Sequence, residues 1–166
     1  MFKKPIIIAE IGCNHMGSLN LAKKMIVAAK NSGADYVKFQ KRDNKYLLGK
    51  KYFEKHPIAE NSFGKNYGKH RDFLEFSFEQ HKELIKFAKK KRIKYSTSVW
   101  EKNSAIQFIK IQNQLDYIKI PSACNLDFEL LNVIADKFKK KIHISFGMTK
   151  KNEIEKFLKF FKKKRR

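Results

Sequence analysis

Two short apolar segments of this chain each carry a lysine close to their carboxyl-terminal end. The segments are residues 34–40, ADYVKFQ, and residues 115–123, LDYIKIPSA, and the lysines are Lys38 and Lys119. Runs rich in β-branched and aromatic residues are typical of buried strands, where an unpaired charge is costly. Two lysines at equivalent strand positions therefore predict a bound anion between them, either a phosphate or a carboxylate. The alternative is that each lysine extends to solvent or pairs with a carboxylate such as that of Glu10.

Other strand-like segments also carry polar residues near their carboxyl-terminal ends. Because side chains alternate along a strand, each of these residues lies on a definite one of the two faces of its strand. Glu10 shares a face with Ile6 and Ile8, and Thr97 shares one with Tyr95. The carboxyl ends of parallel strands lie at one edge of a sheet, so these side chains should converge with the two lysines. The set predicted in this way is Glu10, Lys38, Gln40, Thr97, Lys119, Ser122 and Ser145.

The elements that would position this set alternate regularly between strand and helix. Ser18 and Ser77 are placed as helix N-caps, Gln80 completes a capping box with Ser77, and Gly33 is a helix stop signal. The predicted strands cover residues 5–12, 34–40, 93–100, 115–120 and 141–147. The predicted helices cover residues 18–33, 77–91, 101–113, 127–138 and 150–163.

This alternation predicts an α/β protein with a parallel sheet and right-handed crossovers, because no hairpin signal joins consecutive strands. A doubly wound sheet and a (β/α) barrel both fit the pattern. No G-x-G-x-x-G follows the first strand, which argues against a dinucleotide-binding fold.

The connection between the second strand and its helix, residues 41–76, is unusually long. A connection of this length in a compact domain is usually a functional lid or an inserted element. Because the segment contains several phenylalanine and tyrosine residues, we predict an ordered flap rather than a disordered loop.

Composition places the chain among globular proteins. It has 166 residues and 42% hydrophobic content, which suggests one domain with a real core. No apolar run approaches the roughly 18 residues of a membrane span, so we expect no membrane association. The two cysteines, Cys13 and Cys124, show no metal or redox spacing, and a cytoplasmic location is the simplest expectation.

The net charge of +22 raises the alternative of a nucleic-acid-binding protein. The lysines are spread over nearly every predicted helix, and no RNA- or DNA-binding motif is present. We therefore interpret the charge mainly as solvated helix faces, and predict a basic tail only at residues 162–166.

Five short motifs, in order along the chain, resemble those of the sialic acid synthase family, which makes N-acetylneuraminate, legionaminate and pseudaminate from phosphoenolpyruvate. They are AEIGCNHMG at residues 9–17, VKFQ at 37–40, STSV at 96–99, KIPS at 119–122 and SFGM at 145–148. Each motif alone is weak, but together they extend over nearly the whole chain.

The resemblance implies a TIM-type (β/α) barrel that condenses phosphoenolpyruvate with an N-acylmannosamine-like aldose. It implies that six residues hold phosphoenolpyruvate: Lys38, Thr97, Lys119, Ser122, Ser145 and Gly147. Glu10 matches a catalytic carboxylate that faces the reacting centre, with Gln40 beside it. Asn14 and His15 match sugar-side or rim-structuring residues, and for His15 a hydrogen-bonded loop role is expected rather than a metal ligand. A divalent metal, manganese or magnesium, is expected from the family, but we assign no metal ligand in this chain.

The chain departs from the family pattern at three points. Cys124 stands where the family usually has a glutamate, and we expect a small rim residue there rather than a nucleophile. Phe146 replaces a threonine, which removes one hydroxyl donor. Only about five of the eight strand–helix units of a barrel are present, so residues 1–163 are predicted to be a truncated barrel domain.

We therefore expect a nonulosonic acid synthase-like protein, with enzymatic activity implied by the family but open for this chain alone. The alternatives are an inactive remnant, a half-barrel subunit completed by another chain or by a second copy, and a basic nucleic-acid-binding protein. An aldolase that forms a Schiff base is disfavoured, because two cationic lysines suit anion binding better than one neutral amine does. The expected ligands are phosphoenolpyruvate and an amino-sugar aldose.

Overall fold

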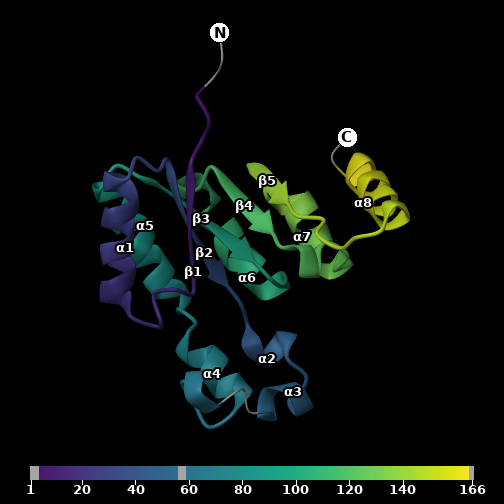
Figure 1. Ribbon diagram of the computed structural model, residues 1–166. Coiled ribbons are helices and arrows are strands. Elements are labelled where there is room, and N and C mark those ends of the chain that lie inside the picture. The colour runs from purple at the N-terminus through teal and green to yellow at the C-terminus, as the bar shows by residue number, and fades with distance from the viewer. Residues whose placement is uncertain (1–3, 56–58, 165–166) are drawn as a thin grey trace. The chain divides into compact units, whose positions relative to one another are not determined.

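The computed structural model describes residues 4–55 and 59–164 of the chain (Figure 1). Strands and helices alternate along it, and β1 pairs with β2, β3 with β4, and β4 with β5, all in parallel. The strands follow the sheet order β1-β2-β3-β4-β5. They are β1 (Ile8–Gly12), β2 (Tyr36–Lys41), β3 (Lys94–Val99), β4 (Tyr117–Ile120) and β5 (Lys141–Ile144). The predicted α/β class with parallel strands is confirmed.

A long helix follows each strand, as predicted, apart from small shifts at the ends. The helices are α1 (Leu19–Asn31), α5 (Phe78–Lys90), α6 (Lys102–Ile109), α7 (Phe128–Lys137) and α8 (Lys151–Lys164). The helix expected over 101–113 ends at Ile109, and a 3-10 turn, Gln112–Gln114, follows it. None of the described helices is both long and apolar enough to cross a bilayer.

The chain forms two compact units. The first contains Met1–Gln40 and Asn44–Ser96, and the second contains Lys41–Asp43 and Thr97–Arg166. Strand β3 begins in the first unit and ends in the second.

The first unit is built around β1, β2, α1 and α5, and Figure 1 shows the two helices side by side. Ser18 caps α1 by accepting from Leu21 N, and Ser77 and Gln80 form the predicted capping box of α5. Phe39 of β2 is fully buried and stacks on Tyr95, with 5.3 Å between ring centroids. Because Phe39 and Lys38 are adjacent in the strand, they point to opposite faces, and Lys38 is on the face away from this aromatic core.

The long connection forms short helices in its described part: α2 (Asn44–Leu47), α3 (Lys50–Glu54), a 3-10 turn (Ala59–Asn61) and α4 (Tyr67–Phe73). Its end is held against the loop after β1 through Gly17. This glycine has φ +72°, and a Cβ there would lie 2.2 Å from the carbonyl oxygen of Phe73. Any other residue would push α4 away from this loop.

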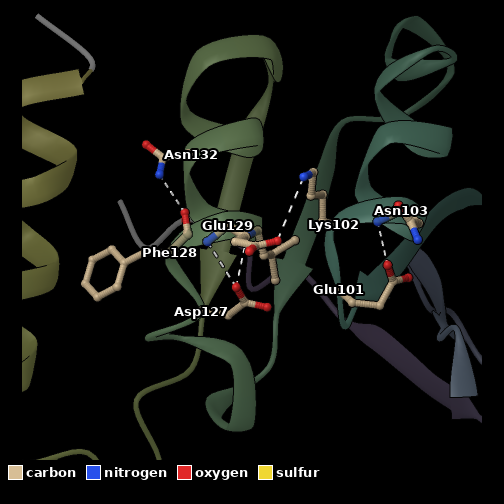
Figure 2. Close-up of polar contacts among 8 residues, drawn as sticks. Glu101, Lys102, Asn103, Asp127, Phe128, Glu129 and Asn132 are labelled. Atoms are coloured by element: carbon tan, nitrogen blue, oxygen red, sulfur yellow. Dashed lines mark hydrogen bonds and ion pairs between the residues drawn. The ribbon is translucent and has the colours of Figure 1, made fainter. Parts of the chain in front are cut away.

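The second unit packs α6 and α7 beside β4, with Phe108, Ile118, Leu130 and Ile134 fully buried. Figure 2 shows the starts of both helices. Glu101 caps α6 by accepting from Ser104 N (2.8 Å) and Asn103 N (2.5 Å), and Asp127 caps α7 by accepting from Glu129 N and Leu130 N. Carboxylates are favourable there, because they accept from unpaired N–H groups at the positive end of the helix dipole.

Helix α8 is amphipathic and packs through Phe157, whose ring meets Phe146 edge-on at 5.1 Å. Lys162–Lys164, the first part of the predicted basic tail, form the last turn of this helix. Residues 165–166 lie outside the described part of the chain.

Candidate functional site

Glu10 and Lys38 lie opposite each other within β1 and β2, each as the third residue of its strand. They are register partners in the parallel pair, so their side chains point to the same face. The Lys38 Nζ lies 2.5 Å from Oε2 of Glu10. Lys38 is only 3% exposed, whereas the Glu10 side chain is 57% exposed. The pairing with Glu10, stated above as the alternative to a bound anion, is therefore present in the protein.

Gln40 follows Lys38 on the same face of β2 and lies nearer the carboxyl end of the strand. The β1–β2 register shifts between Glu10 and Gly12, a bulge at the point where β1 ends. A Cβ on Gly12 would lie 3.1 Å from Nε2 of Gln40, so the amide approaches the backbone at the end of β1. The first unit thus brings together the three residues that the sequence placed there: a carboxylate, an ammonium group and an amide.

Lys119 lies in a second row of register partners. It pairs with Ser98 of β3 on one side and with His143 of β5 on the other. The ring of His143 stacks on Tyr117 with 4.0 Å between centroids. Lys119 is half-buried, and among the residues that the structure describes its ammonium group has no carboxylate within ion-pair distance.

The register corrects the face that was assigned to Thr97. Side chains alternate along β3, so Ser98 points to the Lys119 face and Thr97 points to the opposite one. Thr97 is fully buried and donates its hydroxyl hydrogen to the carbonyl oxygen of Ser98. Ser98 was not predicted from the sequence, because the pairing of β3 with β4 cannot be read from either strand alone.

Ser122, Ser145 and Gly147 meet in the loops after β4 and β5. Gly147 has φ +29°, and a Cβ there would lie 2.8 Å from Cβ and 3.0 Å from Oγ of Ser122. Ser145 N donates to the carbonyl oxygen of Ile120, and the Ser145 carbonyl accepts from Asn125 Nδ2. Asn125, which is buried and directly follows the 3-10 turn Ser122–Cys124, was not predicted, although asparagine is a common loop-ordering residue.

Trp100 and Arg42 form a stacked pair in the second unit, and this pair was not predicted from the sequence. The guanidinium carbon of Arg42 lies 3.8 Å from the indole centroid, and Trp100 N donates to the carbonyl oxygen of Lys41. Arg42 follows the VKFQ motif by two residues and Trp100 follows STSV directly. Their positions at or just after the ends of two predicted strands could have indicated that both residues lie at the carboxyl-end edge of the sheet.

His15 is a structural residue of the loop after β1. It is 2% exposed, stacks on Phe76 at 3.9 Å, and accepts from Gly17 N through Nδ1. Burial lowers the pKa of His15 to about 4, although a hydrogen bond with the Gly12 backbone partly offsets this. The imidazole is neutral near pH 7, which agrees with the loop role expected for it.

Cys124 is buried and its thiol donates to the carbonyl oxygen of Trp100 at 3.0 Å. Burial raises the pKa of Cys124 to about 12, with Asp127 and Glu101 adding to the effect. Since the thiolate is the nucleophilic form, this cysteine is unreactive near neutral pH, as expected for a small rim residue. The Phe146 departure has a packing explanation, because its ring contributes to the contact with α8.

No group of three or more His, Cys, Asp or Glu side chains within residues 4–55 and 59–164 could hold a metal ion. The buried histidines His15 and His81 already use ring nitrogens in hydrogen bonds, with Gly17 N and with the hydroxyl of Tyr95. The described residues therefore do not fit the divalent metal that the family resemblance implies.

Taken together, these observations define a parallel α/β protein with charged and hydroxyl groups at the carboxyl ends of its strands. The chain belongs to the NeuB family, whose model matches residues 25–166. The membership predicted from the five motifs is thereby confirmed.

The relatives carry names from nonulosonic acid synthesis. The chain is 38% identical to human N-acetylneuraminate-9-phosphate synthase over 142 residues, covering 86% of this chain and 39% of the relative. It is 38% identical to the N,N'-diacetyllegionaminic acid synthase of Campylobacter jejuni over 160 residues, covering 94% of this chain and 46% of that protein. The chain thus spans less than half the length of these relatives.

A solved structure supports the same fold. The N-acetylneuraminic acid synthetase of Leptospira borgpetersenii, crystallised with citrate, matches with a TM-score of 0.78 and 28% identity. The match covers 97% of this chain and 51% of that one. This likeness agrees with the predicted partial (β/α) barrel.

Proposed function

We propose that this chain binds phosphoenolpyruvate and takes part in its condensation with an N-acylmannosamine-like aldose, in nonulosonic acid biosynthesis. The sequence covers 39% of its human relative. We therefore propose the complete reaction only together with the remaining part of the enzyme, whether in the same chain, in a complementing chain or in a second copy. A cytoplasmic setting belongs to the same proposal and is supported by the two free cysteines, Cys13 and Cys124.

The observation that carries this proposal is the buried ammonium group of Lys38 in the parallel strand β2, with Gln40 nearer the carboxyl end of the same strand. In parallel α/β proteins, ligands bind outside the carboxyl ends of the strands. Lys119 lies at the matching position of β4, beside hydroxyl groups that can donate to phosphate oxygens. We propose that Lys38 binds an anionic group of the ligand with Gln40 beside it. We propose the same role for Lys119, with Ser98, Ser122, Ser145 and Gly147 as its neighbours. The family motif would assign Thr97 to this site instead of Ser98.

The chemistry needs fixed positive charge and one carboxylate. The C3 carbon of phosphoenolpyruvate attacks the aldehyde carbon, a C–C bond forms, and the aldehyde oxygen takes a proton. Water then adds at C2 and the C–O bond to the phosphate breaks, which releases inorganic phosphate. Lys38 and Lys119 would stabilise the anionic groups throughout, and Glu10 would exchange a proton at the reacting centre.

A thermal-shift titration with phosphoenolpyruvate tests the binding step. Ligand at a hundred times its dissociation constant adds roughly 2.7 kcal/mol to the free energy of unfolding. We expect this shift in the wild type and its loss in Lys38→Met and in Lys119→Met. The matched control is Lys23→Met, which removes an exposed lysine paired with Glu83 on the helices and should leave the shift intact.

Equal shifts in all three lysine variants would show that the ligand binds elsewhere. No shift in the wild type at millimolar phosphoenolpyruvate would rule out the anion site as proposed.

A further inference from the structure

The Glu10–Lys38 pair is asymmetric in a way that a purely structural ion pair does not require. The ammonium group is enclosed by protein, with Lys38 3% exposed, whereas the Glu10 side chain is 57% exposed. Their contact is set by the backbone, since the two residues are register partners of adjacent strands. Lys38 therefore cannot leave the contact, while the Glu10 carboxylate can move into solvent at little cost.

A buried ammonium group needs a negative partner at all times, because an uncompensated charge in this environment is strongly destabilising. In the structure, Glu10 supplies a negative partner at 2.5 Å. A substrate phosphate or carboxylate that reaches Lys38 brings its own negative charge to the same place. Two anions side by side repel each other, so one of them must withdraw.

From this geometry we infer that Glu10 is an exchangeable counter-ion of Lys38, and that a bound substrate anion displaces it. The inference rests on the proposed function, because it assumes that Lys38 binds the substrate. Displacement has two consequences. It weakens anion binding, since the ligand must break an existing ion pair, and it frees the Glu10 carboxylate for proton exchange only after the substrate has bound.

The decisive variant is Glu10→Gln, which keeps the size of the side chain and removes its charge. Binding of inorganic phosphate, pyruvate and phosphoenolpyruvate is measured separately by isothermal titration calorimetry on the full chain. We expect Glu10→Gln to bind phosphoenolpyruvate more tightly than the wild type, by about fivefold or more. The titrations with phosphate and with pyruvate then show whether Lys38 binds the phosphate or the carboxylate of phosphoenolpyruvate.

The direction in which the affinity changes distinguishes a displaced counter-ion from a residue with a purely structural role. A residue that only supports the strands would weaken binding when replaced, whereas a displaced counter-ion strengthens it. The matched control is Glu83→Gln, which makes the same chemical change in the exposed Lys23–Glu83 pair and should leave the affinity unchanged. If Glu10→Gln does not fold, Glu10→Asp keeps the charge but withdraws it from Lys38, and it too should bind more tightly than the wild type.

The outcomes distinguish the two claims. Equal or weaker binding in the Glu10 variants, with normal binding in the wild type, would overturn the displacement and leave the proposed function intact. Binding in Glu10→Gln but not in the wild type would support displacement by a strong competing ion pair. Absence of binding in every variant would overturn the proposed function and the displacement with it.

Discussion

Individual side chains at the strand ends differ sharply in what their environment allows them to do. His15 and Cys124 belong to residue types that often perform catalysis, yet both are buried and held in their neutral forms. Lys38 and Glu10, by contrast, form a charged pair with one open side. At this scale burial separates the residues that stabilise the loops from those that can meet a ligand.

His15 should make the stability of the protein depend on pH. The folded-state pKa is about 4 and the ordinary value is 6.5, so between these values the unfolded chain binds a proton that the folded chain does not. Above pH 6.5 the neutral His15 contributes roughly 3 kcal/mol to the free energy of unfolding. This contribution is lost as the pH falls towards 4. Urea unfolding from pH 4 to 8 measures it, and His15→Asn, which keeps an acceptor for Gly17 N, should lack this part of the profile.

The matched control for losing an imidazole is His70→Asn, since His70 also accepts a backbone N–H through Nδ1. A profile of His15→Asn that is superimposable on that of the wild type would contradict this assignment.

Thr97 and Ser98 allow a direct test of the β3 register. Because Ser98 is the register partner of Lys119, Ser98→Ala should weaken phosphoenolpyruvate binding by about 1 kcal/mol, the usual worth of one hydrogen bond. Thr97→Val keeps the shape of a side chain on the other face and should leave the affinity unchanged. Calorimetry on both variants decides the question, and the reverse pattern would favour the motif-based assignment of Thr97.

At the scale of elements, side-chain caps fix where the helices of the second unit begin. Glu101 is fully buried and satisfies two backbone N–H groups of α6, whereas Glu129 on α7 is exposed and reaches Lys102 only at 3.8 Å. Figure 2 shows these two carboxylates in the same region. A carboxylate that caps a helix should matter more than one in an exposed ion pair.

Replacement of the two glutamates tests this difference. Glu101→Ala should lower the free energy of unfolding by about 1–2 kcal/mol, the range found for lost N-caps. Glu129→Ala, the matched control, should cost less than about 0.5 kcal/mol, because exposed ion pairs contribute little. Urea denaturation measures both values, and similar losses in the two variants would contradict the capping role.

For the molecule as a whole, the net charge of +22 is its most unusual property. Several of the lysines lie in exposed pairs with carboxylates, as in Lys82–Glu79 and Lys164–Asp136. This arrangement agrees with solvated helix faces, which attract polyanions without recognising a sequence.

Binding to single-stranded RNA should therefore be weak and sensitive to salt. We expect dissociation constants of about 10⁻⁴–10⁻⁶ M at physiological salt, the range of non-specific binding. Fluorescence anisotropy with oligonucleotides of different sequence measures it. Nanomolar affinity for one sequence would instead favour the nucleic-acid-binding alternative.

Much of the fold could be predicted because it depends on local chemistry. Ser18, Ser77 and Gln80 cap helices through bonds to residues three positions away, and such spacing is visible in the sequence. The five strands were recognisable from their composition, and the five motifs led to the correct family. The ends of the elements were less predictable, as the early stop of α6 at Ile109 illustrates.

The sequence by itself determined the strand–helix order, the helix caps and the family, because each depends on residues close together in the chain. Only the tertiary structure decided which side chains face each other: Glu10 beside Lys38, and Ser98 rather than Thr97 beside Lys119. The physical reason is that strand register comes from pairing between distant segments, and a shift of one residue turns every side chain to the other face.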